Sequence, residues 1–267
     1  MIKKKLESVI SLLGFDVARF KALRNFARFL DELKNFKRNL DRVEDFKIKP
    51  ILHDYDDFAG SSRGHYFHQD LLVATMIYNR VPERHIDIGS RIDGFVAHVA
   101  SFRKIEVFDI RSLGDIGHDN IVFYQQDVMQ EDFELCEIAD SVSCLHALEH
   151  FGLGRYGDQI NPQAHKIAFR KMLSMLTPGG YLYLSVPLGS KNTTFFNAER
   201  VFTSDEPLSW IQSLQGVSLN RFDFVDDDGR LHSKIPWNSL VVGNCTYGCG
   251  IYTFKKEQSI KHRLAET

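Results

Sequence analysis

From residue 84 onward, short apolar runs alternate with segments of helical periodicity. Apolar runs of strand length between helices are typical of a buried, mostly parallel sheet. We therefore predict an α/β fold with a mostly parallel, seven-stranded sheet. Because only a loop separates the last two runs, an antiparallel strand is expected at one edge. The strand-like runs are 84–88, 104–109, 120–124, 140–145, 180–186, 217–226 and 249–255, and the helical runs lie near 71–78, 94–100, 162–176 and 204–215.

The first part of the chain differs from the rest in charge and in pattern. Apolar residues recur there at helical steps of three and four, and residues 1–47 carry twelve Lys and Arg against seven Asp and Glu. We predict a helical N-terminal extension over 1–50, followed by the α/β domain over 51–267. The apolar face of the helical extension could pack on the α/β domain, mediate a homo-oligomer or contact an anionic membrane.

Composition excludes several classes of function. A net charge of −2 gives no support for a nucleic-acid partner, and no apolar run reaches the length of a membrane span. The first fifteen residues imitate a signal peptide, but Glu7 and Ser8 interrupt the apolar patch, so we expect mature protein. Four scattered cysteines are typical of reduced thiols, and we expect a cytoplasmic protein.

The stretch "HIDIGSRIDGF" predicts a strand that runs into a ligand-binding loop. Ligands bind beyond the carboxyl ends of parallel strands, and glycine lets the backbone turn and a ligand approach closely. A nicotinamide loop requires a middle glycine, where this chain has Arg91. Asp87 before the loop would repel a pyrophosphate and attract an ammonium or sulfonium group. The loop therefore favours a cationic cofactor.

Acidic residues follow the next two strands. Asp109 ends the second strand and can accept hydrogen bonds from both hydroxyls of a ribose. Asp127 follows the third strand and can accept from an adenine amino group. The fourth strand leads into a polar cluster, His146, Glu149 and His150. These residues predict a nucleoside-containing ligand beside a group of acid–base side chains.

These motifs occur in the order and spacing of class I S-adenosylmethionine-dependent methyltransferases. The chain resembles that family over about residues 80–255 through "DIG", Asp109, Asp127, "LHALEHF" and "LTPGGYLYLSVP". The resemblance implies a Rossmann-like fold and S-adenosylmethionine as cofactor. It assigns the methionine part of the cofactor to Asp87, Gly89, Ser90 and Gly94, the ribose to Asp109 and Ile110, and the adenine to Asp127 and Val128.

The glycine loop departs from the family pattern, Asp-x-Gly-x-Gly-x-Gly. Arg91 replaces one glycine and the last, Gly94, arrives one residue late. Either the loop bulges and still admits the cofactor, or the pocket is altered. Two alternatives therefore stay open, a catalytically inactive binding or scaffold protein and another kind of nucleotide-dependent enzyme.

We predict methyl transfer to a small molecule, most simply to a hydroxyl, with sugars and glycan precursors among the candidates. A hydroxyl acceptor must lose a proton, and histidine is suited to accept it near neutral pH. His150 is the first choice of base, and His146 and Glu149 follow. Tyr66, ahead of the first strand, could cover the sulfonium by cation–π attraction.

We predict no metal, although two patterns raise the question. His-x-x-Glu-His at 146–150 matches an inverted zinc-protease signature, but that signature requires a long helix. His65, His68 and Asp70 could together ligate a divalent cation. Neither pattern outweighs the methyltransferase resemblance.

Overall fold

The computed structural model describes residues 24–39, 46–130 and 133–258. The chain divides into two compact units, residues 1–61 and 62–267. The sequence-based boundary at residue 50 stays a prediction. The oligomer and membrane predictions for the extension fall largely on residues outside the described ranges. In those ranges no helix has the length and apolarity needed to cross a bilayer.

The described part of the first unit contains one long helix, α3 (Phe26–Arg38), and a single turn at Asp54–Asp56. The Asn25 side chain, just before the helix, donates to the carbonyl of Leu52 over 2.9 Å. The Tyr55 hydroxyl donates to the carboxylate of Glu32. These two bonds fix α3 against the extended segment that follows it.

The second unit is built on an eight-stranded sheet with the order β3-β2-β1-β4-β5-β10-β8-β9. Its first five strands in that order are parallel, and β10 pairs antiparallel with both β5 and β8. A separate two-stranded sheet is formed by β6 and β7. The strands are β1 (His85–Ile88), β2 (Ile105–Asp109), β3 (Ile121–Gln125), β4 (Ala139–Leu145), β5 (Leu176–Leu188), β6 (Thr193–Phe195), β7 (Glu199–Val201), β8 (Val217–Val225), β9 (Leu231–His232) and β10 (Gly248–Lys256).

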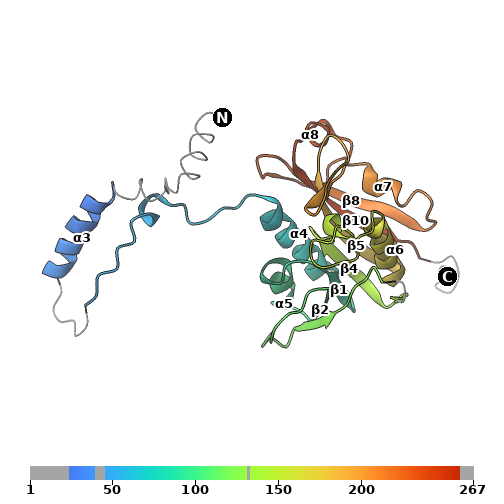
Figure 1. The fold of residues 1–267 in the computed structure, drawn as a ribbon, viewed down its shortest axis with the longest axis horizontal. Coiled ribbons are helices and arrows are strands. Elements are labelled where there is room, and N and C mark those ends of the chain that lie inside the picture. The colour runs from blue at the N-terminus through green and yellow to red at the C-terminus, as the bar shows by residue number, and fades with distance from the viewer. Residues whose placement is uncertain (1–23, 40–45, 131–132, 259–267) are drawn as a thin grey trace. The chain divides into compact units, whose positions relative to one another are not determined.

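Helices cover both faces of the sheet (Figure 1). On one face α4 and α5 enclose a cluster that includes Ile77, Phe95 and Val107. On the other, α6 packs Phe169 and Met172 onto the central strands. Both faces of the central strands are buried, so the polar side chains on β1 and β4, such as Asp87 and Ser143, are buried as well. The helices of this unit are α4 (His65–Arg80), α5 (Ala97–Ala100), α6 (Ala164–Met175), α7 (Glu206–Ser209) and α8 (Leu240–Gly243).

The predicted α/β class and all seven predicted strands are confirmed, and two details differ. The predicted antiparallel edge is present, and the short β9 adds an eighth strand to it. The helix expected at 204–215 is wrong in length, because α7 covers only Glu206–Ser209 and tighter turns follow it. Those turns place the ring of Trp210 against Phe169 and Phe202.

Candidate active site

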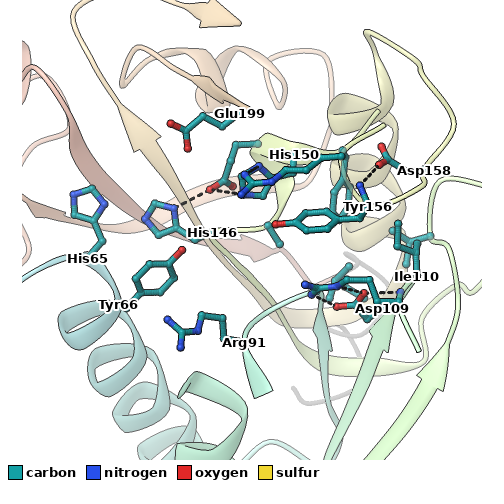
Figure 2. Close-up of a pocket in the computed structure, with 18 of the residues that line it drawn as sticks. His65, Tyr66, Arg91, Asp109, Ile110, His146, His150, Tyr156, Asp158 and Glu199 are labelled. Carbon is teal, nitrogen blue, oxygen red and sulfur yellow. Dashed lines mark hydrogen bonds and ion pairs between the residues drawn. The ribbon is translucent and has the colours of Figure 1, made fainter. Parts of the chain in front are cut away.

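A cavity of about 740 Å³ opens at the carboxyl ends of the parallel strands (Figure 2). Its lining follows the order of the sheet, from Asp127 after β3, through Asp109 on β2 and Gly89 after β1, to His150 after β4. The first turn of α4 and the loops next to β8 and β10 complete it. One space therefore connects the predicted cofactor residues with the predicted acid–base cluster.

Gly89 forms the floor between these two groups. Its φ of +71° belongs to the left-handed region, and its N–H donates to the carbonyl of Phe108 over 2.9 Å. A Cβ added at Gly89 would lie 3.1 Å from the Cβ of Ala147. A side chain here would therefore be strained and would crowd the adjacent wall, so glycine is required.

Gly94, which comes one residue later than in the family pattern, lies in a wide helical turn at Ile92–Val96 that accommodates the extra residue. The N–H of Val96 donates to the carbonyl of Arg91, five residues earlier, so the turn holds one more residue than an α-helical turn. Gly94 does not line the cavity. A Cβ there would lie 2.7 Å from the Asp70 carboxylate, so Gly94 is needed for packing against α4.

Asp87 and Ser90 are also outside the cavity lining. The Asp87 carboxylate is fully buried and accepts hydrogen bonds from the Ser90 N–H, the Ser90 hydroxyl and the Ser143 hydroxyl. Burial raises the pKa of Asp87 to about 6, although these bonds oppose the shift. The expected direct attraction between Asp87 and a sulfonium is therefore not supported by its position. Asp87 instead fixes the backbone of the loop.

His85 extends this buried network beneath the loop. Its Nε2 lies 3.2 Å from the Ser143 hydroxyl and its Nδ1 lies 2.7 Å from the Ser141 hydroxyl. Because Ser143 donates to Asp87, Nε2 carries the proton and Nδ1 accepts from Ser141. Complete burial lowers the pKa of His85 to about 3. The ring is therefore a neutral support for the loop.

Asp109 lines the cavity at the end of β2, with Ile110 beside it. Arg111 donates to the Asp109 carboxylate from its backbone N–H over 2.8 Å and from its guanidinium over 2.9 Å. The guanidinium also lies 4.7 Å from the ring centre of Tyr156. A second guanidinium nitrogen of Arg111 also donates to Asp109, and a carboxylate has about four acceptor positions, so one position remains for a ligand.

Asp127 and Val128 line the cavity beyond β3. The Met129 N–H donates to the Asp127 carboxylate over 2.8 Å, which fixes the direction of the side chain. Val128 is buried, and it supplies an apolar wall beside this acid. An acceptor next to an apolar wall is the environment expected of an adenine pocket.

Arg91 lines the cavity from a position that is more than half exposed. Its guanidinium pairs with Asp93 over 2.9 Å, and both side chains are more than half exposed. It also lies 5.1 Å from the ring centre of Tyr66, which lines the cavity (Figure 2). The residue that departs most from the family pattern therefore lines the cavity, and its salt bridge with Asp93 holds the guanidinium on the exposed side.

His146 and Glu149 form a buried pair at the β4 end. Nδ1 of His146 lies 2.8 Å from Oε1 of Glu149, and the two side chains are 5% and 1% exposed. Burial opposes protonation of His146, but Cys249 and Glu149 raise its pKa above the ordinary value. Neither Nε2 of His146 nor Oε2 of Glu149 has a hydrogen-bond partner within the described chain.

His150 has a fixed orientation. Its Nδ1 lies 2.7 Å from the carbonyl of Ala198, which can only accept, so Nδ1 carries the proton. Arg155 donates to the same carbonyl over 3.0 Å. Nε2 of His150 therefore presents a lone pair, 3.8 Å from Oε1 of Glu149.

The zinc-protease pattern at 146–150 is not realised. His146 has a φ of +48° at the end of β4, and a single short turn at Leu148–His150 replaces the long helix. The other possible metal site, His65, His68 and Asp70 on α4, is not formed either, because the three side chains have different partners. His68 contacts the carbonyl of Gly229 over 3.1 Å and Asp70 accepts from Gln69, whereas His65 lies against His146.

Comparison with known proteins places this arrangement in a fold family. Residues 121–209 match the model of a family described as a Caenorhabditis protein of unknown function, DUF268. The sequence matches no curated protein. Among solved structures, the cyclase SpnF is 14% identical, with 76% of this chain and 87% of that chain covered and a TM-score of 0.52. An O-methyltransferase from a trans-AT PKS multienzyme of Brevibacillus brevis, bound to S-adenosyl-L-homocysteine, is 15% identical, with 71% of each chain covered and a TM-score of 0.50.

The chain has the class I methyltransferase fold. At these identities the likeness shows the fold alone, and a cyclase and a methyltransferase share it. Within the methyltransferase fold, nine of the twelve predicted site residues line one cavity. They are Tyr66, Gly89, Asp109, Ile110, Asp127, Val128, His146, Glu149 and His150.

Several lining residues were not predicted. Arg111 lies between Asp109 and Tyr156, and Asp226, Asp227 and Tyr247 come from the loops beside β8 and β10. The three adjacent acids at 226–228 are typical of a solvated hairpin tip, but two of them line the cavity. The sequence does indicate the two loops that supply most of them, 151–161 with its glycines and the long segment 227–247, as regions that shape an acceptor pocket.

Proposed function

We propose that this domain binds S-adenosylmethionine and transfers its methyl group to a hydroxyl of a small molecule. The observation that carries the proposal is the continuity of the cavity. Gly89, Asp109 and Asp127 lie at one end and His150 at the other, with no intervening wall among the described residues. A donor and an acceptor held in one such space can react in line.

The cofactor end has the donors and acceptors that an adenosyl group requires. Asp109 would accept from a ribose hydroxyl through its remaining acceptor position, and Asp127 with Val128 would hold the adenine. Gly89 leaves the floor free of a side chain for the methionine part. When bound, S-adenosylmethionine supplies a methyl group on a positively charged sulfur. Tyr66 offers an aromatic ring on the same wall, and a ring next to a cation contributes roughly 0.5–2 kcal/mol.

His150 is the proposed general base. The carbonyl of Ala198 holds the proton on Nδ1, which leaves Nε2 to accept the proton of the acceptor hydroxyl. Glu149 lies close enough to stabilise the imidazolium that forms. General-base catalysis of this kind typically contributes about 10²–10⁴-fold in rate.

The acceptor end favours a polyhydroxylated molecule. Glu199, Asp226 and Asp227 line it with carboxylates, which accept hydrogen bonds from hydroxyl groups. Tyr156 and Tyr247 add aromatic faces against which an aliphatic ring can pack. A sugar or glycan precursor is the proposed acceptor class.

Binding is tested by calorimetry with S-adenosyl-L-homocysteine and, in parallel, NAD. Binding heat with S-adenosyl-L-homocysteine but not with NAD supports the proposal. No heat at millimolar ligand overturns it and favours a scaffold, while a preference for NAD favours another nucleotide-dependent enzyme. Transfer is tested with methyl-labelled S-adenosylmethionine and a panel of simple sugars, catechols and amines. Label on amines alone would overturn the hydroxyl assignment.

The role of His150 is tested with His150→Gln. We expect the rate constant for transfer to fall by about 10²–10⁴-fold with unchanged affinity for S-adenosyl-L-homocysteine. The matched control is His118→Gln, because His118 is exposed and lies outside the cavity. An unchanged transfer rate in His150→Gln would exclude His150 as the base.

A further inference from the structure

Three side chains from distant parts of the sequence meet at the acceptor end of the cavity. His65 begins α4, His146 ends β4 and Cys249 lies on β10, and one ligand atom from each lies within 4.8 Å of the other two. The imidazole rings of His65 and His146 stack at 5.2 Å with an interplanar angle of 6° (Figure 2). Two histidines and a cysteine are the ligand types preferred by zinc.

The hydrogen bonds of His146 leave one nitrogen free for a ligand. The Nδ1–H of His146 donates to Glu149 over 2.8 Å, so Nε2 is the nitrogen available to a metal, which would displace any proton held there. That nitrogen is buried, on a side chain only 5% exposed, and has no partner among the described residues. Since buried polar atoms are normally satisfied, this one indicates a group that binds there.

We propose that His65, His146 and Cys249 bind a zinc-type divalent cation. Zinc bonds of about 2.0–2.1 Å to nitrogen and 2.3 Å to sulfur place tetrahedral ligand atoms roughly 3.3–3.7 Å apart. The three atoms reach that spacing when they move inward by about 1 Å. The metal itself would be the missing partner of Nε2.

Glu149 completes the arrangement from outside the ligand set. A metal-bound histidine usually donates its other ring N–H to a carboxylate, which fixes the tautomer and orients the ring. Glu149 makes this contact with His146. The thiol of Cys249 favours zinc over magnesium or calcium, which prefer oxygen ligands.

The coordination set leaves one position free on the cavity side. His65 and His146 line the cavity, whereas Cys249 is fully buried behind them. Zinc sites with three protein ligands and an open position bind substrate or water there. If the proposed methyl transfer holds, the acceptor hydroxyl would occupy this position, and the cation would lower its pKa before His150 accepts the proton.

The test is titration of the metal-free protein with Co²⁺, which takes tetrahedral zinc positions and absorbs visibly. Wild-type protein is expected to bind equimolar cobalt and to show a sulfur-to-cobalt charge-transfer band in the near ultraviolet. Cys249→Ser is expected to lose that band. Zn²⁺ is expected to displace the cobalt and abolish the spectrum.

The matched control is Cys245→Ser, which removes another buried thiol four residues away and should leave the spectrum unchanged. His65→Ala keeps the thiolate band but should weaken metal affinity by at least the roughly 10–100-fold typical of a lost outer-shell partner. Since His65 is only half-buried, this variant tests the site even if Cys249→Ser does not fold.

Absence of a sulfur-to-cobalt band in wild-type protein would overturn the proposal, and so would a band that survives in Cys249→Ser. Calorimetry with S-adenosyl-L-homocysteine on the same preparations separates this result from the proposed function. Metal binding without cofactor binding would support the metal site and overturn the proposed methyl transfer. Cofactor binding without the cobalt band would overturn the metal site and leave the proposed methyl transfer standing.

Discussion

The two ends of the cavity are built in different ways. The cofactor end comes from one continuous part of the chain, the ends of β1, β2 and β3 with the residues directly after them. The acceptor end combines the start of α4, the turn after β4, Glu199 and the loops beside β8 and β10. Parallel strands bring their carboxyl ends to one edge by topology alone, whereas the acceptor end depends on long-range packing.

The polar groups at the two ends also differ. At the cofactor end each acid has an internal partner, Arg111 for Asp109 and the Met129 N–H for Asp127. At the acceptor end the acids Asp226, Asp227 and Glu199 are also partnered, but Nε2 of His146 and Oε2 of Glu149 are buried without a hydrogen bond among the described residues. The comparison indicates a preformed cofactor cradle next to a reactive region that a bound group must complete.

The largest expected effect that separates the two ends is on Asp109. Replacing it with alanine should weaken binding of S-adenosyl-L-homocysteine by about 10- to 100-fold, since a charge-assisted hydrogen bond contributes roughly 1.5–3 kcal/mol. Cobalt binding at the acceptor end should not change. Calorimetry and cobalt spectroscopy on the same sample measure both.

The control for this variant is Asp119→Ala, which removes an exposed acid from the β2–β3 loop. Its affinity for S-adenosyl-L-homocysteine should equal that of wild type. If Asp109→Ala binds normally while still folded, the assignment of the ribose to the end of β2 is wrong.

The sequence predicted the cofactor end well because its signals are local. A strand, an acid at its end and the spacing to the next strand place Asp109 and Asp127 on one edge without any knowledge of packing. Asp87 has the same local signal, yet its side chain points into the buried network. Alternation along a strand separates inward from outward side chains only when the strand is exposed on one face, and β1 is buried on both.

At the acceptor end the sequence indicated two loops, 151–161 and 227–247, but not the individual residues that meet there. Cys249 lies 103 positions after His146, and no local pattern joins it to His65. The acids at 226 and 227 have the composition of a hairpin tip, and only the fold turns them towards the cavity. These contacts are set by the packing of β10 and α4 against β4 and β5, and such long-range packing produces no periodic pattern in the sequence.

A second, smaller effect tests whether the cofactor loop depends on the buried network beneath it. The pKa of His85 is about 3 in the folded protein, against an ordinary value of 6.5, because the ring is fully buried. As pH falls below 6.5, His85 is protonated in the unfolded chain but stays neutral in the folded chain, so the free energy of unfolding decreases. At pH 5 this loss is about 2 kcal/mol.

His85→Gln removes this contribution. The difference in unfolding free energy between wild type and variant should therefore narrow by about 2 kcal/mol between pH 7.5 and pH 5. Urea unfolding at both pH values measures this difference. The contributions of the other buried histidines cancel, because both proteins contain them. A difference that stays constant would mean that His85 is not desolvated beneath the loop.

The smallest expected effect concerns Arg91, the residue that departs most from the family loop. Its exposed pair with Asp93 and its position on the exposed side of the cavity lining give it little influence on the cavity, because exposed ion pairs contribute about 0–1 kcal/mol. Arg91→Ala should therefore change the affinity for S-adenosyl-L-homocysteine by less than about 3-fold. If the variant bound more than about 10-fold tighter, a gain of roughly 1.4 kcal/mol, Arg91 would be closing the cavity in solution. The cofactor end would then be blocked rather than preformed, and its contrast with the acceptor end would no longer hold.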